Sequence, residues 1–270
     1  MEPECLRVDA ALVARGLASS RARAQALIAA GLVTLNGAPV AKAAQKVAPA
    51  DALYVLGETC PYVSRGGLKL EKALNGFDVH VTGLVCADIG ASTGGFTDVL
   101  LRAGAARVYA IAVGAGQLHP SLLEEERVIS LEHVNARALR RDMFDPAPTL
   151  AVMDVSFISV RLILPALFDV LGDGGRVVTL VKPQFEAGRQ AVGKRGVVSK
   201  PEAHARVLNE LVAFAPTLGW RVRGLDFSPI AGGDGNLEFL ADIVPEARCG
   251  RPVDSVRVAD AVRRAHAAKL

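Results

Sequence analysis

The spacing of hydrophobic residues changes near residue 60 and divides the chain into two parts. In the first part, apolar residues at helical spacing predict helices over 7–17 and 19–32. A hairpin that turns at Asn36–Gly37 is predicted over 33–40, and a further strand over 46–55. This order of elements predicts a small α+β module.

In the second part, uninterrupted apolar runs alternate with helical segments. The predicted strands are 84–90, 107–114, 127–133, 149–156, 175–183, 220–229 and 236–244, and the predicted helices are 94–104, 160–172 and 201–219. This alternation is typical of a largely parallel sheet that is covered on both faces. The last two strands are joined by PIAGGDG, which is too short for a crossover helix, so we expect them to pair antiparallel. The second part is therefore predicted to be an α/β domain of Rossmann-like type.

The composition indicates the general class of protein and says little about its function. Of the 270 residues, 51% are hydrophobic, which is enough for a buried core, and the formal net charge is only +3. There is no signal peptide and no run of about 18–20 apolar residues, so we expect a cytoplasmic protein that does not enter a membrane. The cysteines lack CxxC spacing and a histidine at metal-ligand spacing, so we expect no metal; they are Cys5, Cys60, Cys86 and Cys249.

The segment DIGASTGG, residues 88–95, is the first candidate binding site. Its glycines lie between a predicted strand and a predicted helix, where they allow a sharp turn or close contact between backbone and ligand. The first N–H groups of the helix are free to bind a polar ligand. Asp88 is suited to orient a polar or cationic group. NAD, FAD, nucleotides and S-adenosylmethionine all bind at such turns, but the GxGxxG and GxxxxGK[ST] spacings are both absent.

Longer motifs give a more specific indication than the glycine loop. They are YVSRGGLKLEKAL, DIGASTGGFTDVLL, VMDVSFIS, VKPQFEAGR and GNLEFL, between about Arg7 and Ile243. Together they resemble the S4-domain ribosomal RNA 2′-O-methyltransferases, a family often labelled TlyA or hemolysin A. The stretch RVDAALVARGLASSRARAQALIAAGLVTLNG resembles an S4-type RNA-binding domain. The resemblance implies an S4-like domain at 1–59, a linker at 60–64, a class I S-adenosylmethionine-dependent methyltransferase domain of FtsJ-like, Rossmann-like fold at 65–246, and a basic tail at 247–270.

The resemblance also implies a catalytic tetrad, and each of its positions is filled: Lys69, Asp154, Lys182 and Glu238. A ribose 2′-hydroxyl is a poor nucleophile at neutral pH, so its methylation needs a base or a group that stabilises the developing alkoxide. A lysine is normally protonated, so Lys182 can act as a base only if desolvation or a neighbouring cation such as Lys69 favours its neutral form. We expect Lys182 to be the base or the alkoxide stabiliser, and Lys69 to position the ribose or a phosphate.

S-adenosylmethionine is the cofactor that the resemblance implies, with its methionine and ribose portions at the glycine loop and its adenine end near Asn135. The expected cofactor-binding residues are Asp88, Gly90, Ala91, Ser92, Thr93, Gly94, Gly95, Phe96, Asn135 and Asp154.

Arginines near the first two helices and a basic loop at 184–200 are candidates for RNA binding, because guanidinium groups bind phosphates bidentately. The alternative for both is a solvated surface. Phe157 and Phe185 are interpreted as packing residues. The expected partners are ribosomal RNA or ribosomal subunits, and the expected RNA-binding residues are Arg7, Arg15, Arg21, Arg23, Arg65, Arg189, Lys194 and Arg195.

One position departs from the family pattern. The second strand of such a sheet normally ends in an acid that binds the ribose hydroxyls of the cofactor. Where the family has VDVGYGQL this chain has IAVGAGQL, so Ala112 replaces the acid and Ala115 the tyrosine. Because of Ala112, a non-catalytic RNA-binding or assembly factor stays open as an alternative to the enzyme. A hemolysin-like membrane activity is a second alternative, which only the family label suggests. The modified nucleotide, the oligomeric state, the role of the tail and any coupling through the linker also stay open.

Overall fold

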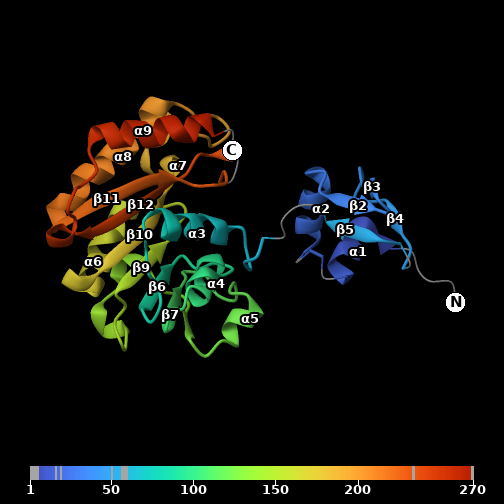
Figure 1. The fold of residues 1–270 in the computed structure, drawn as a ribbon, viewed down its shortest axis with the longest axis horizontal. Coiled ribbons are helices and arrows are strands. Elements are labelled where there is room, and N and C mark those ends of the chain that lie inside the picture. The colour runs from blue at the N-terminus through green and yellow to red at the C-terminus, as the bar shows by residue number, and fades with distance from the viewer. Residues whose placement is uncertain are drawn as a thin grey trace. The chain divides into compact units, whose positions relative to one another are not determined.

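The computed structural model divides the chain into two compact units, Met1–Pro61 and Tyr62–Leu270 (Figure 1). The structure describes residues 6–15, 17–18, 20–49, 51–55, 60–232 and 235–268.

The first unit is the predicted α+β module. Asn36 and Gly37 take positive φ angles of 51° and 84°, which form the predicted hairpin turn between β2 and β3. Ser20 is the N-cap of α2, and its hydroxyl accepts a hydrogen bond from Arg23 N. The elements are β1 (Leu6–Arg7), α1 (Val8–Ala14), α2 (Arg21–Ala29), β2 (Val33–Leu35), β3 (Ala38–Pro39), β4 (Lys46–Val47) and β5 (Leu53–Val55).

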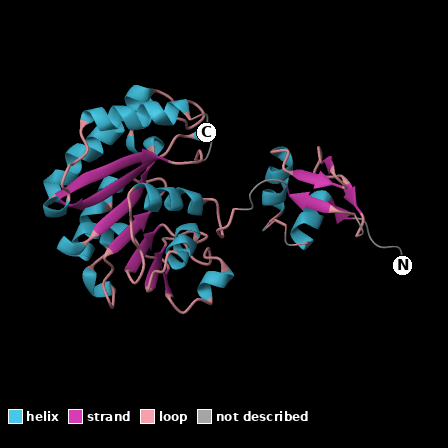
Figure 2. Cartoon of the chain, viewed as in Figure 1, coloured by secondary structure: helices cyan, strands magenta, loops and turns pink. Residues whose placement is uncertain are grey.

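The second unit contains a seven-stranded sheet with helices on both faces (Figure 2). Its strand order is β11-β12-β10-β9-β6-β7-β8, and all neighbours pair in parallel except β12, which is antiparallel to β10 and β11. The elements are α3 (Gly66–Gly76), β6 (Val85–Ile89), α4 (Gly95–Arg102), β7 (Arg107–Ile111), α5 (Pro120–Leu123), β8 (Val128–Leu131), β9 (Leu150–Met153), α6 (Leu164–Leu171), β10 (Arg176–Val181), α7 (Pro183–Glu186), α8 (Pro201–Phe214), β11 (Trp220–Phe227), β12 (Phe239–Pro245) and α9 (Ser255–Ala267). The predicted α/β class and the antiparallel closing strands are confirmed.

Successive strand residues enter separate cores on the two faces of this sheet. Cys86 and Val178 belong to one core, with Leu70 of α3 and Leu100 of α4. The residues next to them point the other way, and that second core contains side chains of α6, α8 and α9. Because both faces are buried, the parallel strands are apolar throughout rather than alternating, as their sequence indicates.

The basic tail forms part of this domain. Asp254 caps α9 by accepting a hydrogen bond from Arg257 N, and Val258 and Val262 of the helix are buried in the second core. Arg264 of the same helix pairs with Asp226 of β11 at 2.8 Å. The tail thus contributes apolar packing and an ion pair to the methyltransferase-like unit.

The order of the strands places the candidate site. In the sheet, β6 has β7 as its neighbour on one side and β9 on the other, so the order of the strands reverses at β6. At this switch the carboxyl ends of neighbouring strands separate and leave room for a ligand. Among the described residues, no helix is both long and apolar enough to cross a membrane.

Candidate functional site

The glycine loop after β6 requires glycine for steric reasons. Gly90 and Gly94 have positive φ angles of 83° and 95°. A Cβ on Gly90 would lie 2.6 Å from the backbone oxygen of Asp154, and one on Gly95 would lie 2.2 Å from Ser64 Oγ. The loop therefore lies directly against the end of β9 and the residues before α3, and a side chain would push these segments apart.

Asp88, at the end of β6, is a buried carboxyl group with an unused acceptor. It is 1% exposed, and its Oδ2 accepts a hydrogen bond from Thr97 Oγ1 at 2.7 Å. Burial, with a smaller effect of the Asp154 charge, raises the pKa of Asp88 to about 7. Its Oδ1 is one of the few buried side-chain atoms of the described chain that make no hydrogen bond. A buried acceptor without a donor is costly, so this oxygen is prepared for a ligand.

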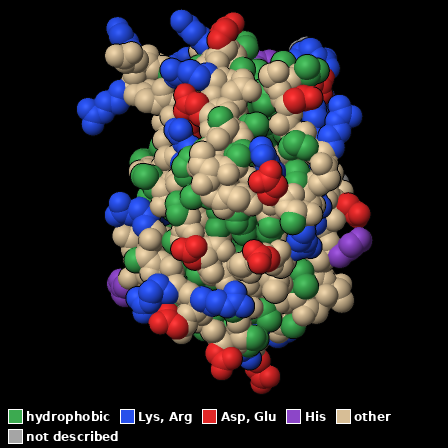
Figure 3. Space-filling view, turned by 90° about the vertical axis from the view of Figure 1, so that its left-hand side faces the viewer, with side chains coloured by type: hydrophobic (Ala, Val, Ile, Leu, Met, Phe, Trp, Pro, Cys, Tyr) green, Lys and Arg blue, Asp and Glu red, His purple; other side chains and the backbone are tan. Residues whose placement is uncertain are grey.

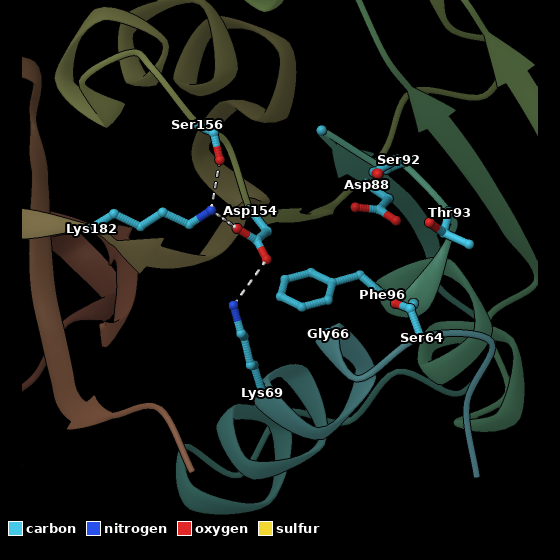
Figure 4. A pocket seen from close by; sticks show the side chains of 13 residues that line it. Ser64, Gly66, Lys69, Asp88, Ser92, Thr93, Phe96, Asp154, Ser156 and Lys182 are labelled. Carbon is cyan, nitrogen blue, oxygen red and sulfur yellow. Dashed lines mark hydrogen bonds and ion pairs between the residues drawn. The ribbon is translucent and has the colours of Figure 1, made fainter. Parts of the chain in front are cut away.

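A cavity of about 290 Å³ lies in front of Asp88 and the glycine loop (Figure 4). It collects most of the predicted cofactor-binding residues, together with Ser64 and Gly66 from the segment before α3, which sequence reasoning missed. The lining residues are Ser64, Gly66, Lys69, Asp88, Gly90, Ala91, Ser92, Thr93, Gly95, Phe96, Asp154, Ser156 and Lys182.

The predicted tetrad comes together at the edge of this cavity from α3, the ends of β9 and β10, and the start of β12. Lys182 Nζ lies 2.5 Å from Asp154 Oδ1 and donates to Ser156 Oγ at 3.0 Å. Lys69 Nζ lies 2.6 Å from Glu238 Oε2 and 3.6 Å from Asp154 Oδ2. Figure 4 shows Lys182 reaching Asp154 from the left and Lys69 reaching it from below. Two ammonium groups and two carboxylates thus form one nearly closed, charge-balanced network.

A second cavity of about 470 Å³ continues past the glycine loop to the ends of β7 and β8. It shares Gly90, Ser92, Asp154 and Ser156 with the first cavity. Both Ala112 and Asn135 line it, so the replaced acid and the expected adenine-end residue belong to one compartment. Because Ala112 stands where the family has an acid, no carboxylate at the end of β7 lines this cavity. The nearby Glu132 accepts a hydrogen bond from Gly116 N and does not line it.

A third cavity of about 360 Å³ lies on the other side of the tetrad and shares Ser156 and Lys182 with the first. Phe157 lines it, with a φ of +65° and 90% of its side chain exposed. The prediction that Phe157 is a packing residue is therefore wrong. Its ring centroid is 5.0 Å from that of Phe185, and an aromatic group held outward in this way is available to a ligand.

Three of the four predicted RNA-binding arginines of the first unit have partners within the protein. Arg7 and Arg21 bind the buried carboxylate of Asp9 at 3.0 and 3.3 Å. Together with Gln25 they hold the pKa of Asp9 well below its usual range. Arg15 donates to the backbone oxygens of Ala48, Pro49 and Asp51. These contacts give the arginines a structural role, and their outer surfaces remain exposed; RNA binding by them and by Arg23 stays a prediction.

The basic candidates of the second unit are exposed. They are Arg65 at the N-terminus of α3, and Arg189, Lys194 and Arg195 in the loop that follows α7. Val192 and Gly196 of that loop line the third cavity. On the face drawn in Figure 3, basic side chains are mixed with acidic ones and form no continuous basic patch. The described residues contain no cluster of His, Cys, Asp and Glu that could hold a metal ion.

Comparisons with known proteins agree with this geometry. Residues 62–242 match the FtsJ-like methyltransferase family and residues 6–53 match the S4 domain. A Bacillus subtilis protein named as a candidate rRNA methyltransferase is 46% identical over 263 residues, which is 96% of this chain and 94% of that protein. The 16S/23S rRNA (cytidine-2′-O)-methyltransferase TlyA of Mycobacterium tuberculosis is 44% identical over 260 residues, 96% of each chain. A solved structure of a candidate hemolysin from Streptococcus thermophilus has a TM-score of 0.79 and 45% identity, and covers 98% of this chain and 97% of its own.

Proposed function

This chain belongs to the FtsJ-like methyltransferase family and carries an S4 domain, and from that premise we propose that it methylates a cytidine ribose 2′-hydroxyl of ribosomal RNA in the cytoplasm, with S-adenosylmethionine as cofactor. The Mycobacterium tuberculosis relative, which is named as a cytidine-2′-O-methyltransferase, supports the nucleotide and the acceptor atom. The observation that carries the proposal is the convergence of Lys69, Asp154, Lys182 and Glu238 beside the glycine-lined cavity.

The first and second cavities fit the two ends of the cofactor. When bound, S-adenosylmethionine supplies a methyl group activated by a sulfonium. Asp88 Oδ1 lacks a donor within the described chain, and the cationic amino group of a methionine moiety would satisfy it. The glycine loop lets the backbone approach the ligand, and the cavity around Ala112 and Asn135 has room for the nucleoside.

Lys182 is the residue that we assign to the reacting oxygen. Bound cofactor would supply both the methyl group and the sulfur that leaves with the electron pair, and the protein would have to remove the proton of the 2′-hydroxyl. The 2.5 Å contact lets Lys182 pass one proton to Asp154 and take up the hydroxyl proton, so the pair ends with one more proton than it began with. Asp154 releases that proton to water after the transfer. The lysine also stabilises negative charge that develops on the oxygen.

Lys69 and Glu238 hold this pair in place. Their side chains are 10% and 2% exposed, so water competes little for their contacts. The Lys69 ammonium lies 3.6 Å from Asp154 Oδ2, which helps to keep Oδ1 turned toward Lys182. We therefore assign Lys69 and Glu238 as positioning residues for the reacting pair.

RNA would reach this site past the third cavity. The exposed Phe157 lines this cavity, and so do Val192 and Gly196 of the loop that carries the exposed Arg189, Lys194 and Arg195. A nucleotide turned out of its RNA stack needs an aromatic or apolar surface for its base and cations for its phosphates. The S4 domain supplies a second RNA contact, which supports a structured ribosomal RNA rather than a free nucleotide as substrate.

The test uses the full chain, S-adenosylmethionine and ribosomal subunits from a strain that lacks the corresponding gene. We expect one or more new 2′-O-methylcytidines by mass spectrometry of nuclease digests. Lys182→Met should abolish them while leaving cofactor affinity nearly unchanged. A matched control is Lys72→Met, since Lys72 lies on α3 one turn from Lys69 but binds Asp226 outside the cavity. Unmodified RNA with the folded, cofactor-loaded wild-type protein would contradict the proposal.

Ala112 favours a second candidate, an RNA-binding or assembly factor that has lost cofactor binding. Calorimetric titration of S-adenosylmethionine into the full chain separates the two functions. Micromolar binding supports the enzyme. If binding is undetectable both alone and with ribosomal subunits present, the non-catalytic function is favoured.

A further inference from the structure

The inference starts from the buried polar atoms that lack a hydrogen-bond partner. In the described residues, the side-chain atoms of this kind are Asp88 Oδ1, Asp154 Oδ1 and Gln184 Oε1. Asp154 Oδ1 still has the Lys182 ammonium 2.5 Å away. The other two lie in different cavities: Asp88 faces the cofactor cavity, and Gln184 lines the third cavity. The first and third cavities, which Lys182 lines, are therefore each lined by a residue that has a buried oxygen without a donor.

The third cavity is placed for the substrate rather than for the cofactor. Lys182 and Ser156 line both this cavity and the first one, so they form the wall between them. A ribose whose 2′-oxygen contacts Lys182 from the side opposite the cofactor has its nucleotide in the third cavity. Gln184 lies two residues after Lys182 in the chain, so a single nucleotide can contact both residues.

The other polar side chains of this cavity are already engaged. Asn236 uses Nδ2 to donate to Gly196 O at 3.0 Å, and its Oδ1 accepts from Val198 N at 3.1 Å. Glu238 binds Lys69. Gln184 is thus the polar side chain of this cavity whose buried oxygen needs a donor from outside the chain.

We propose that Gln184 determines the base specificity of the reaction, by accepting at Oε1 a hydrogen bond from the exocyclic amino group of the target cytosine. This inference rests on the proposed function, because it takes the third cavity as the nucleotide site. Cytosine presents an N4 amino donor where uracil presents an O4 acceptor. With the Gln184 amide in the orientation that the structure shows, uracil would place a carbonyl against the amide oxygen and leave both without a donor. The cavity therefore favours cytidine over uridine.

The segment that carries Gln184 is fixed in place, as a specificity residue requires. Glu186, on the same short helix α7, accepts hydrogen bonds from Ser159 Oγ at 2.6 Å and from Val160 N at 2.7 Å. Arg161 pairs with the same carboxylate at 3.5 Å. These contacts join α7 to the segment that follows Ser156 and Phe157, so the acceptor and the reacting pair keep their separation.

The first test measures nucleotide binding and needs no catalysis. Cytidine and uridine monophosphates are titrated into the full chain with S-adenosylhomocysteine present, and binding is followed by ligand-detected NMR. Wild type should bind the cytidine nucleotide roughly tenfold more tightly. Gln184→Met should remove this preference, and Gln184→Glu, which keeps an acceptor oxygen, should retain it. Gln190→Met, which changes an exposed glutamine outside the cavity, should behave as wild type.

The second test compares methylation of two RNAs that differ only by C or U at the modified position. The ratio of kcat/KM for C over U should fall by roughly tenfold in Gln184→Met, with S-adenosylhomocysteine affinity unchanged. Equal nucleotide binding by wild type, or a preference that persists in Gln184→Met, overturns the inference even if RNA is methylated. A Gln184-dependent preference without methylation by wild type leaves the inference standing and contradicts the proposed function.

Discussion

Lys69 Nζ lies 2.6 Å from Glu238 Oε2, although the two residues are 169 positions apart in the sequence. The contact joins α3, which precedes the glycine loop, to the start of β12, the last strand of the sheet. Both side chains are buried, so neither charge is hydrated as it is in the unfolded chain. Each charge therefore depends on the other for its stabilisation, and Lys69 depends also on Asp154.

We expect Glu238→Ala to lower the free energy of unfolding by about 3–5 kcal/mol, the cost of leaving a buried charge without its partner. The double variant Glu238→Ala/Lys69→Met should recover part of this loss, since it removes the uncompensated cation. Urea denaturation of the four proteins gives the coupling energy. The exposed pair Arg221–Glu246 is the control, and Glu246→Ala should cost less than about 1 kcal/mol. Additive effects of the two buried substitutions would show that Lys69 does not depend on Glu238.

Cofactor affinity should depend on pH through Asp88. Burial raises the pKa of this carboxyl group to about 7 in the free protein. Below that pH Asp88 is neutral and cannot attract an ammonium group. The association constant for S-adenosylhomocysteine should therefore fall by up to about tenfold for each unit below pH 7 and level off above it. Calorimetry between pH 5.5 and 7.5 measures this, with Asp88→Asn as the control, which should bind weakly and without that dependence. A constant affinity for wild type over this range would exclude Asp88 as the ammonium partner.

The same carboxyl group should destabilise the ligand-free protein. An unfolded chain releases the Asp88 proton near pH 3.8, whereas the folded protein keeps it to about pH 7. Folding therefore takes up a proton between these values, and this group's contribution to stability decreases as pH rises through that window. Asp88→Asn cannot ionise, so its stability relative to wild type should increase from pH 4 to pH 7, by an amount on the order of 1–4 kcal/mol. Thermal unfolding of both proteins across that range measures the difference, and parallel curves would refute the linkage.

The sequence pattern accounts for the proximity of the candidate site residues that lie at strand ends. Asp88, Asp154 and Lys182 each follow or end a strand of one parallel sheet, and the carboxyl ends of such strands meet at one edge. Lys69 lies on a helix and Glu238 precedes an antiparallel strand, so no such rule applies to them. All four tetrad residues were assigned from family resemblance, and the structure supplies the contact between Lys69 and Glu238.

The other site residues depend on backbone geometry, solvent exposure and hydrogen-bond partners, which the sequence pattern does not reveal. Phe157 has no sequence feature that distinguishes it from a buried phenylalanine, and its exposure follows from a positive φ angle that periodicity does not reveal. Arg15 resembled a phosphate ligand, but its guanidinium reaches carbonyl oxygens of the turn before β5, more than 30 residues away. Gln184 was missed because a lack of hydrogen-bond partners can be recognised only in three dimensions.

Gly90→Ala should disrupt the cofactor site. Its Cβ would lie 2.6 Å from the backbone oxygen of Asp154, at a φ of +83° that alanine adopts poorly. Relief of the clash requires the ends of β6 and β9 to separate. We expect stability to fall by about 1–3 kcal/mol and cofactor binding to weaken at least tenfold. Gly116→Ala is the matched control, since Gly116 also has a positive φ of 64° but a Cβ there would meet no atom within 4 Å. Equal effects of the two substitutions on cofactor affinity would show that φ alone, and not contact with Asp154, matters.

Ala112→Asp should strengthen cofactor binding. Ala112 lines the second cavity at the end of β7, where a carboxylate would face the ribose hydroxyls. A charge-assisted hydrogen bond of this kind contributes about 1.5–3 kcal/mol, which corresponds to a roughly 10- to 100-fold lower Kd for S-adenosylhomocysteine by calorimetry. Ala115→Asp is the control, because it adds the same charge to the loop after β7 at a residue that does not line that cavity. If only Ala112→Asp tightens binding, the ribose occupies this end of the cavity. Equal gains from both variants would point to a general effect of negative charge, and no gain from Ala112→Asp would mean that the ribose is held elsewhere.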